Sequence, residues 1–290
     1  MSRRGLFLFL AIGLAWGVPY FFLAVAGKDF STPSIIFSRV VIGAAILVPF
    51  AIKRGEFKAA LKVWPWVLAF AAIEMIGPWF LLTEAERHVP SGLAGLMIAT
   101  VPIFGMLIAY FFQGDKSVRH PKTLAGLAIG FAGVVLLVGI DSVTGTFEPI
   151  YLLMLVLAAL GYAVAPAIVN TKMKDVPAAG MMGLSLLIVA AFYAIPALSN
   201  LPGEFAAGPG IESLAALLGL GVISSALAFV MFFELVREVG SARATLVTYP
   251  NTAWALMLGI IFLHEPITIG LVTGLPLVAL GSYLALRRHA

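Results

Sequence analysis

The sequence SARATLVTYPNTAW, from Ser241 to Trp254, has a counterpart earlier in the chain, SGLAGLMIATVP, from Ser91 to Pro102. Residues around both stretches recur at two constant spacings. At 148 residues these are Glu86/Glu234, Gly92/Gly240, Pro102/Pro250, Gly126/Gly274 and Gly133/Gly281, and at 144 residues Gly17/Gly161 and Pro33/Pro177. Registers this constant predict an internal duplication. The boundary falls in DSVTGTFEP, so we divide the chain into repeats 1–145 and 146–290.

The composition identifies the solvent around this duplicated chain. Of its 290 residues, 61% are hydrophobic and 11% are charged, and the mean hydropathy is +1.06. Soluble domains carry about a quarter charged residues, so the sequence predicts an all-α polytopic membrane protein. There is no cysteine, which excludes disulfides and thiolate metal sites. We expect no metal and no other cofactor.

Apolar runs long enough to cross a bilayer, about 20 residues each, recur along the whole chain. The ten predicted transmembrane helices cover residues 6–25, 34–52, 63–82, 92–112, 123–140, 150–169, 178–198, 214–236, 242–262 and 267–286. The run from Gly5 to Ala26 is longer than the 7 to 15 apolar residues of a signal peptide, so we interpret it as a retained first helix. Each half holds five helices. Because five is odd, the second repeat must be inverted relative to the first.

The basic residues predict the orientation of these helices. Of the 18 Lys and Arg residues, 15 fall in segments on the side of the N-terminus; Lys28 and Arg87 lie on the other side, and Arg39 lies within a helix. By the positive-inside rule both termini are cytoplasmic, and we expect a multi-pass protein of the inner (plasma) membrane. The pI is near 9.4, but the charges are scattered and form no patch for nucleic acid.

An inverted repeat is typical of transporters whose substrate site lies between the halves near the midplane. Pro102 and Pro250 fall about halfway along the fourth and ninth helices, where proline kinks a helix, and we expect them to act in gating. Thr248, Tyr249, Asn251 and Thr252 surround the second proline. These polar side chains predict that the ninth helix lines a wet cavity.

Glu74, in the third helix, breaks the repeat because its counterpart is Val222. An intramembrane carboxylate indicates a functional site. Arg39 lies about 9 Å and Glu74 about 12 Å from the outer face at 1.5 Å per residue, so the sequence predicts a structural or coupling ion pair between them. If Glu74 is unpaired instead, it is a candidate proton carrier. The sequence leaves both interpretations open.

The third group of candidates is aromatic. These residues lie within predicted helices, and the rings near mid-helix are able to stack on a flat or cationic ligand, although packing inside the protein explains each of them as well. The group consists of Trp16, Tyr20, Trp79, Tyr162, Tyr249 and Trp254. Together with Glu74, Thr248 and Asn251 they form the predicted substrate-binding set.

No arrangement of nucleophile, base and orienting group has a recognisable spacing. His264-Glu265 is followed by proline and lacks the second histidine of a zinc-protease helix. The sequence therefore predicts that the protein is not an enzyme.

The motifs resemble the ten-helix EamA-type exporters of the drug/metabolite transporter superfamily. The resemblance rests on WG at Trp16 and Gly17, on Arg39, and on VPSGLAGLMIATVPIFGMLIAYFFQGD with its counterpart REVGSARATLVTYPNTAWALMLGIIFLHE. It extends over both halves and implies two inverted five-helix bundles around a central cavity. The overall pattern and aromatic content are also similar to the aromatic amino-acid exporters of the YddG type. Leu160, Asp115 and His264 depart from the usual motifs, which leaves the substrate open.

The interpretation is a secondary exporter that works by alternating access on small amphipathic metabolites, aromatic or other neutral amino acids first. We expect a monomer in the lipid bilayer that binds a small-molecule substrate and no nucleic acid; proton coupling is open. The alternatives are a passive channel or facilitator, a drug or metabolite carrier for a substrate other than an amino acid, and, last, an intramembrane enzyme.

Overall fold

The structure is a computed structural model that describes residues 2–113, 121–143, 148–239 and 247–286. These residues form helices joined by turns, and none of them lies in a β-strand. The helices are α1 (Arg3–Ala26), α2 (Thr32–Lys53), α3 (Phe57–Lys62), α4 (Trp64–Ala71), η1 (Ala72–Ile76), α5 (Gly77–Ala85), α6 (Ser91–Ile98), α7 (Val101–Gln113), α8 (Pro121–Val143), α9 (Pro149–Lys172), α10 (Ala178–Ala206), α11 (Ile211–Gly219), η3 (Leu220–Leu227), α12 (Ala228–Val239), α14 (Thr248–Phe262) and α15 (Ile269–Leu286). The predicted all-α class is confirmed.

Within the described ranges, seven helical stretches are long and apolar enough to cross a bilayer. They are Arg3–Ala26, Thr32–Lys53, Trp64–Ala85, Ser91–Ile108, Pro149–Lys172, Ala178–Ala206 and Ile211–Phe232. Three shorter apolar stretches, Thr123–Gly133, Pro250–Phe262 and Val272–Gly281, coincide with the predicted fifth, ninth and tenth helices. The chain is therefore a helical protein that passes through the membrane several times.

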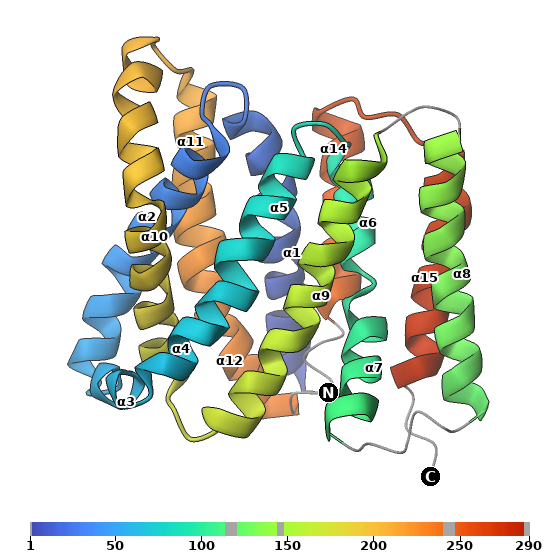
Figure 1. Cartoon of the computed structure of the whole chain (residues 1–290), viewed down its shortest axis with the longest axis horizontal. Helices are drawn as coiled ribbons and strands as arrows, with labels where there is room; N and C mark the ends of the chain where they lie inside the picture. The colour runs from blue at the N-terminus through green and yellow to red at the C-terminus, as the bar shows by residue number, and fades with distance from the viewer. Residues whose placement is uncertain (1, 114–120, 144–147, 240–246, 287–290) are drawn as a thin grey trace.

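The helices stand side by side in one bundle (Figure 1). The helices α2 and α10 pack together at one edge, and α8 packs against α15 at the opposite edge. In the last pair, an added Cβ at Gly281 would lie 2.2 Å from the backbone nitrogen of Gly130, so only glycine permits this approach. Between the two edges, α1 packs against α14, α5 against α9, and α6 against α14.

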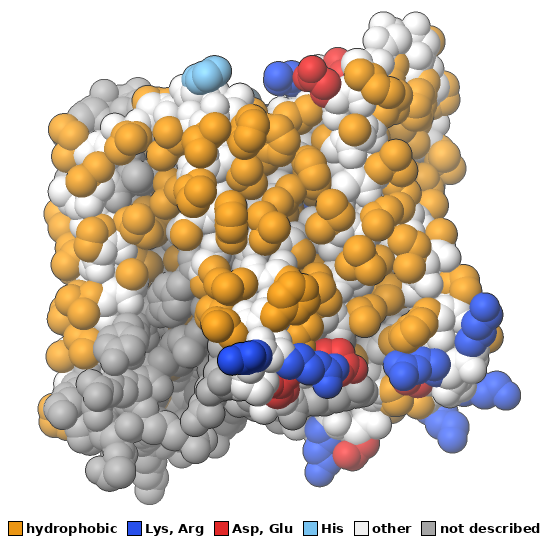
Figure 2. Space-filling view, turned by 180° about the vertical axis from the view of Figure 1, so that it is seen from behind, with side chains coloured by type: hydrophobic (Ala, Val, Ile, Leu, Met, Phe, Trp, Pro, Cys, Tyr) orange, Lys and Arg blue, Asp and Glu red, His pale blue; other side chains and the backbone are white. Residues whose placement is uncertain are grey.

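The two ends of the bundle differ in charge. We call the end with the N-terminus and α3 the inner end, and the opposite end the outer end (Figure 1). The middle of the surface is largely hydrophobic, while Lys and Arg gather mainly along the inner end (Figure 2). Large apolar side chains such as Phe7, Phe192 and Ile195 are exposed on this belt. A hydrocarbon environment satisfies such a surface without burial in protein.

The helix that was predicted as residues 63–82 is not uniform. It consists of α4, the π-helical segment η1 and α5. Pro78 has no N–H to donate to the carbonyl of Glu74, and the N–H of Gly77 bonds to the carbonyl of Ala72, five residues earlier. The hydroxyl of Tyr193 on α10 donates to the carbonyl of Ile76, the last residue of η1, at 2.7 Å. This local widening of the helix contains Glu74, and π-helical turns of this kind are frequent at functional sites.

A second π-helical segment, η3, begins at Leu220, 148 residues after the first residue of η1. It carries Ser224 and Ser225, which are both buried. The counterpart of Pro78 in this register is Ala226, so proline is not the cause of the second widening. Both segments nevertheless carry polar side chains, Glu74 in η1 and Ser224 and Ser225 in η3.

The predicted kink at Pro102 is a break between two helices. The helix α6 ends at Ile98, and Pro102 is the second residue of α7. The carbonyl of Met97 accepts a hydrogen bond from the Thr100 hydroxyl at 2.6 Å, and that of Gly95 accepts one from Thr252 at 3.1 Å. Pro250 is the third residue of α14, and residues 240–246, the start of the predicted ninth helix, lie outside the described ranges.

Candidate functional site

Arg39 on α2 is buried, with 6% of its surface exposed. Its Nε donates to the hydroxyl of Ser225 on η3 at 3.1 Å, and its guanidinium carbon lies 3.9 Å from the centre of the Trp79 ring. The serine and the ring fix the guanidinium in place, since a stacked cation gains from the ring face. Among the described residues, its two terminal nitrogens form no hydrogen bond.

The predicted ion pair between Arg39 and Glu74 is not formed. The depths of the two residues match, but Arg39 faces Trp79 and Ser225. Glu74, on η1, is half-buried, and its Oε2 is inaccessible and has no partner in the described part of the chain. The Glu74 carboxylate is instead the largest electrostatic neighbour of the Tyr162 hydroxyl on α9.

Tyr162 lies at the centre of the buried polar residues. Its hydroxyl is within electrostatic range of Glu74, Tyr20, Arg39 and Glu86. These five side chains come from α1, α2, η1, α9 and the residue after α5. We call these five side chains, which come from both halves of the chain, the polar centre.

Glu86, the residue that follows α5, was not predicted as a site residue. Only 8% of its surface is exposed, and neither carboxylate oxygen has a hydrogen-bond partner in the described residues. It lies within electrostatic range of Glu265 and Arg39. In the sequence Glu86 belongs to the charged stretch EAERH, which is typical of a solvated turn. Its side chain instead turns back into the bundle.

Another predicted residue, Asn251, borders the polar centre beside Tyr20. Tyr20 on α1 is buried with 4% of its surface exposed, and Asn251 on α14 with 7%. The Tyr20 hydroxyl lies beside the Asn251 amide, whose Oδ1 has no partner within the described ranges. Buried polar atoms in folded proteins almost always have a protein or water partner, so unpartnered atoms from several helices indicate a place for a polar ligand or water.

Other predicted residues pack elsewhere. The ring of Trp16 lies 5.5 Å from that of Phe229 and 4.9 Å from that of Phe232, and Trp254 packs on α1 at Gly17. The carbonyl of Thr248 accepts a hydrogen bond from Thr252 at 2.9 Å. The side chain of Tyr249 lies outside the described residues.

At the outer end, Glu265 ties α14 to the start of α6. Its Oε1 accepts from the backbone N–H of Ser91 at 2.7 Å, and its Oε2 accepts from the Ser91 hydroxyl at 2.9 Å and the N–H of Gly92 at 3.2 Å. A Cβ at Gly259 would lie 2.2 Å from Oε2, so this glycine leaves room for the carboxylate. We call Glu265, Ser91 and Gly92 the outer latch. A carboxylate at a helix N-terminus is favourable because it accepts the unpaired N–H groups.

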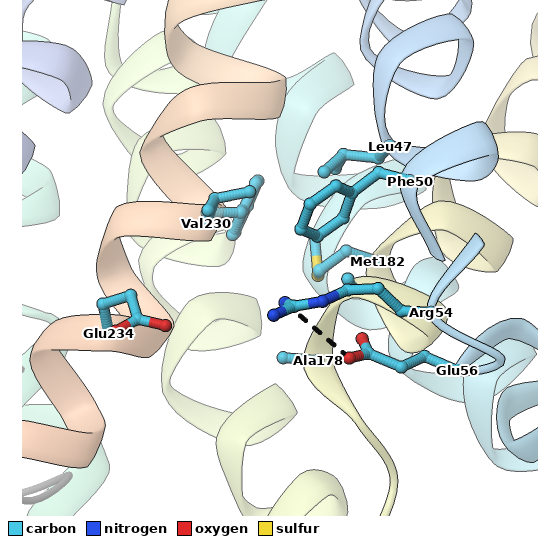
Figure 3. A pocket seen from close by; sticks show the side chains of 10 residues that line it. Leu47, Phe50, Arg54, Glu56, Ala178, Met182, Val230 and Glu234 are labelled. Atoms are coloured by element: carbon cyan, nitrogen blue, oxygen red, sulfur yellow. Dashed lines mark ion pairs between the residues drawn. The ribbon is translucent and has the colours of Figure 1, made fainter. Parts of the chain in front are cut away.

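At the inner end, a cavity opens between α2, α10 and α12 (Figure 3). It is lined by Leu47, Phe50, Arg54, Glu56, Ala178, Ala179, Met182, Phe229, Val230 and Glu234. Arg54 pairs with Glu56 at 3.8 Å, and Glu234 lies across the opening on α12 (Figure 3). The volume of about 30 Å³ admits one or two waters. Phe229, which lines this cavity, also contacts the ring of Trp16.

A membrane-embedded helical bundle with a buried, charged polar centre is the architecture of a membrane transport protein. No group of three or more His, Cys, Asp or Glu side chains able to hold a metal occurs in the described part of the chain. The chain belongs to the EamA-like transporter family, whose sequence profile matches residues 3–139 and 149–287. The resemblance to this family is confirmed.

Several named relatives cover most of the chain. It is 25% identical over 286 residues to YedA of Escherichia coli strain K12, an uncharacterized inner membrane transporter (94% of this chain, 90% of the relative). It is 29% identical over 274 residues to YvbV, an uncharacterized transporter of Bacillus subtilis strain 168 (91% and 86%). It is also 24% identical over 263 residues to a probable terminal-alkyne amino-acid exporter of Streptantibioticus cattleyicolor (90% and 86%).

The fold has a counterpart among crystal structures. One protein of known structure matches with a TM-score of 0.66 and 22% identity, over 98% of this chain and 96% of the matched chain. This likeness extends over the whole bundle and supports its architecture.

Proposed function

We propose that the protein is a secondary exporter of amino acids, aromatic or other neutral ones, and that it works by alternating access. Its ten transmembrane helices form two inverted repeats, residues 1–145 and 146–290, in the inner (plasma) membrane, with both termini cytoplasmic. The monomer binds its substrate at the polar centre. The observation that carries the proposal is the set of unpartnered, buried polar atoms on Glu74, Glu86 and Asn251 beside Arg39.

The comparisons support the substrate class and the location. One relative is named as a probable amino-acid exporter, and another as an inner membrane transporter. The family profile matches twice, once in each proposed repeat. The aromatic content that resembles exporters of the YddG type makes tryptophan and phenylalanine the first substrates to test.

The packing of the fourth and ninth helices supports alternating access. The outer latch ties α14 to α6, whereas α7, beyond the break at Pro102, packs against α9. The two helices are therefore held together at the outer end, and the inner part of the fourth helix, α7, packs against a different helix. We propose that Pro102 and Pro250 permit these helices to exchange this arrangement for one that is closed at the inner end.

The test is uptake of labelled tryptophan, phenylalanine and threonine into proteoliposomes, with and without unlabelled amino acid inside. Saturable uptake stimulated by internal amino acid supports a carrier. Linear, unstimulated flux would identify a passive facilitator. Absence of flux for all three would refute the amino-acid assignment and direct the search to other metabolites.

A further inference from the structure

Arg39 and Glu86 are opposite charges that are both buried and lie within electrostatic range of each other. They do not form an ion pair in the described structure: Arg39 bonds to Ser225, and both oxygens of Glu86 lack a partner. Leaving a buried charge without a partner is costly. Two such groups that are within electrostatic range of each other but not paired would both be satisfied by a molecule bound between them.

The guanidinium is already oriented for a planar anion. The Ser225 hydroxyl accepts a hydrogen bond from Nε, and Trp79 covers one face of the guanidinium. The edge with the two terminal nitrogens is therefore the part left to bind a ligand. Two parallel N–H donors match the two oxygens of a carboxylate. Arg39 is therefore built to hold a carboxylate.

Glu86 provides the complementary pole. Its two oxygens accept hydrogen bonds and donate none when ionised, which suits the three donors of an ammonium group. The Tyr20 and Tyr162 hydroxyls lie within electrostatic range of Glu86 and add neutral polar groups around it. The Glu265 carboxylate is also within electrostatic range of Glu86, and this second negative charge further favours a cation at Glu86. Glu74 is not among the electrostatic neighbours of Arg39, so Glu86, and not Glu74, forms the opposite pole.

We infer that Arg39 and Glu86 bind the zwitterionic head group of an α-amino acid, with the α-carboxylate on Arg39 and the α-ammonium on Glu86. This inference rests on the proposed function and makes it more specific. The site discriminates by the presence of both charges. An amine without a carboxylate leaves Arg39 unsatisfied, and an acid without an amine leaves Glu86 unsatisfied.

The first test uses the unaltered protein and compares tryptophan with tryptamine and with indole-3-propionate. Thermal stabilisation of the purified protein measures binding, and inhibition of labelled tryptophan counterflow measures transport. We expect each analogue, which lacks one charged group, to bind about tenfold or more weakly than tryptophan. Equal binding of tryptamine, or of indole-3-propionate, would overturn the inference.

The second test assigns the poles. Arg39→Gln should weaken tryptophan about tenfold or more and leave tryptamine unchanged, while Glu86→Gln should weaken tryptophan and leave indole-3-propionate unchanged. Arg3→Gln and Glu212→Gln, at exposed positions, are the charge-matched controls. Equal loss for tryptophan and the analogue in a folded variant contradicts the assignment, and Arg39→Lys and Glu86→Asp repeat the comparison if either variant fails to fold.

The two readouts separate the inference from the proposed function. If tryptophan shows counterflow but the analogues bind equally well, the proposed exporter function stands and the zwitterion site is refuted. If tryptophan binds more tightly than both analogues but shows no counterflow, the zwitterion site stands and tryptophan export is refuted. Neither binding nor flux for tryptophan, phenylalanine or threonine refutes both.

Discussion

The outer latch makes a quantitative prediction about the balance between outward-closed and outward-open states. Glu265→Ala removes three hydrogen bonds, two from the backbone N–H groups of Ser91 and Gly92 and one from the Ser91 hydroxyl. Hydrogen bonds to a charged acceptor contribute about 1.5–3 kcal/mol each when buried. Water can replace these partners at the end of the bundle, so we take about 2–3 kcal/mol for all three together.

This energy applies only to the closed arrangement, because the latch must break when α6 and α14 separate. The equilibrium should therefore move towards the outward-open state by a factor of about 30–140. Ser91→Ala removes only the hydroxyl donor and should move it by a factor of about 5, since a single hydrogen bond is worth about 1 kcal/mol.

The assay is thiol labelling from the outer side. The chain has no cysteine, so one introduced thiol is the only reactive one. Leu256 on α14 is buried against Gly92 of α6, and Leu256→Cys reports separation of the two helices. A membrane-impermeant maleimide should label this thiol faster when Glu265→Ala is present, and more slowly when saturating substrate favours the closed state. Equal labelling rates with and without Glu265 would refute the latch.

Three further predictions concern other parts of the bundle. If the Glu74 carboxylate carries a coupled proton, Glu74→Gln should retain tryptophan counterflow but abolish the stimulation of tryptophan uptake by an imposed pH gradient. Unchanged stimulation of uptake in proteoliposomes would show that Glu74 does not couple transport to protons. Pro78→Ala restores an N–H and should convert η1 to a regular turn, which misplaces Glu74. We therefore expect this variant to lose the stimulation by a pH gradient, as Glu74→Gln does, while its counterflow and its thermal melt change little. Normal stimulation by the gradient would show that the π-helical turn is not needed for coupling. Gly281→Ala places a methyl against Gly130 and should destabilise the protein by about 1–3 kcal/mol, as measured by thermal unfolding. The control is Gly203→Ala, which should be neutral because a Cβ there would meet no atom within 4 Å. Equal effects of the two substitutions would contradict the tight packing of α8 on α15.

The length of the apolar runs was sufficient to predict the seven described stretches that are long enough to cross a bilayer. The predicted third span, 63–82, corresponds to the stretch Trp64–Ala85, because a span of apolar residues identifies itself without knowledge of its neighbours. The π-helical turn within it was not predicted. Proline alone does not predict it, because many prolines kink a helix without a π-helical turn, and tertiary contacts such as that of Tyr193 with Ile76 are not visible in the sequence.

The polar centre was predicted in part. Glu74 and Tyr162 were identified because ionisable and aromatic residues within spans are unusual, and the structure brings both together. The predicted ion pair between Arg39 and Glu74 is not formed. Residue number gives the depth of a side chain in the membrane, but the direction in which it points around the helix is set by packing. Glu86 was missed because a charged residue at a helix end has the same sequence signature whether it turns to solvent or into the bundle.

The central claim is that the polar centre is the transport site. The most direct measurement is trans-stimulated tryptophan uptake by Arg39→Gln and by its control Arg3→Gln, reconstituted at equal amounts of folded protein. The account predicts wild-type uptake for the control and a reduction of about tenfold or more for Arg39→Gln. Equal uptake by the two variants would contradict it and place the substrate elsewhere in the bundle.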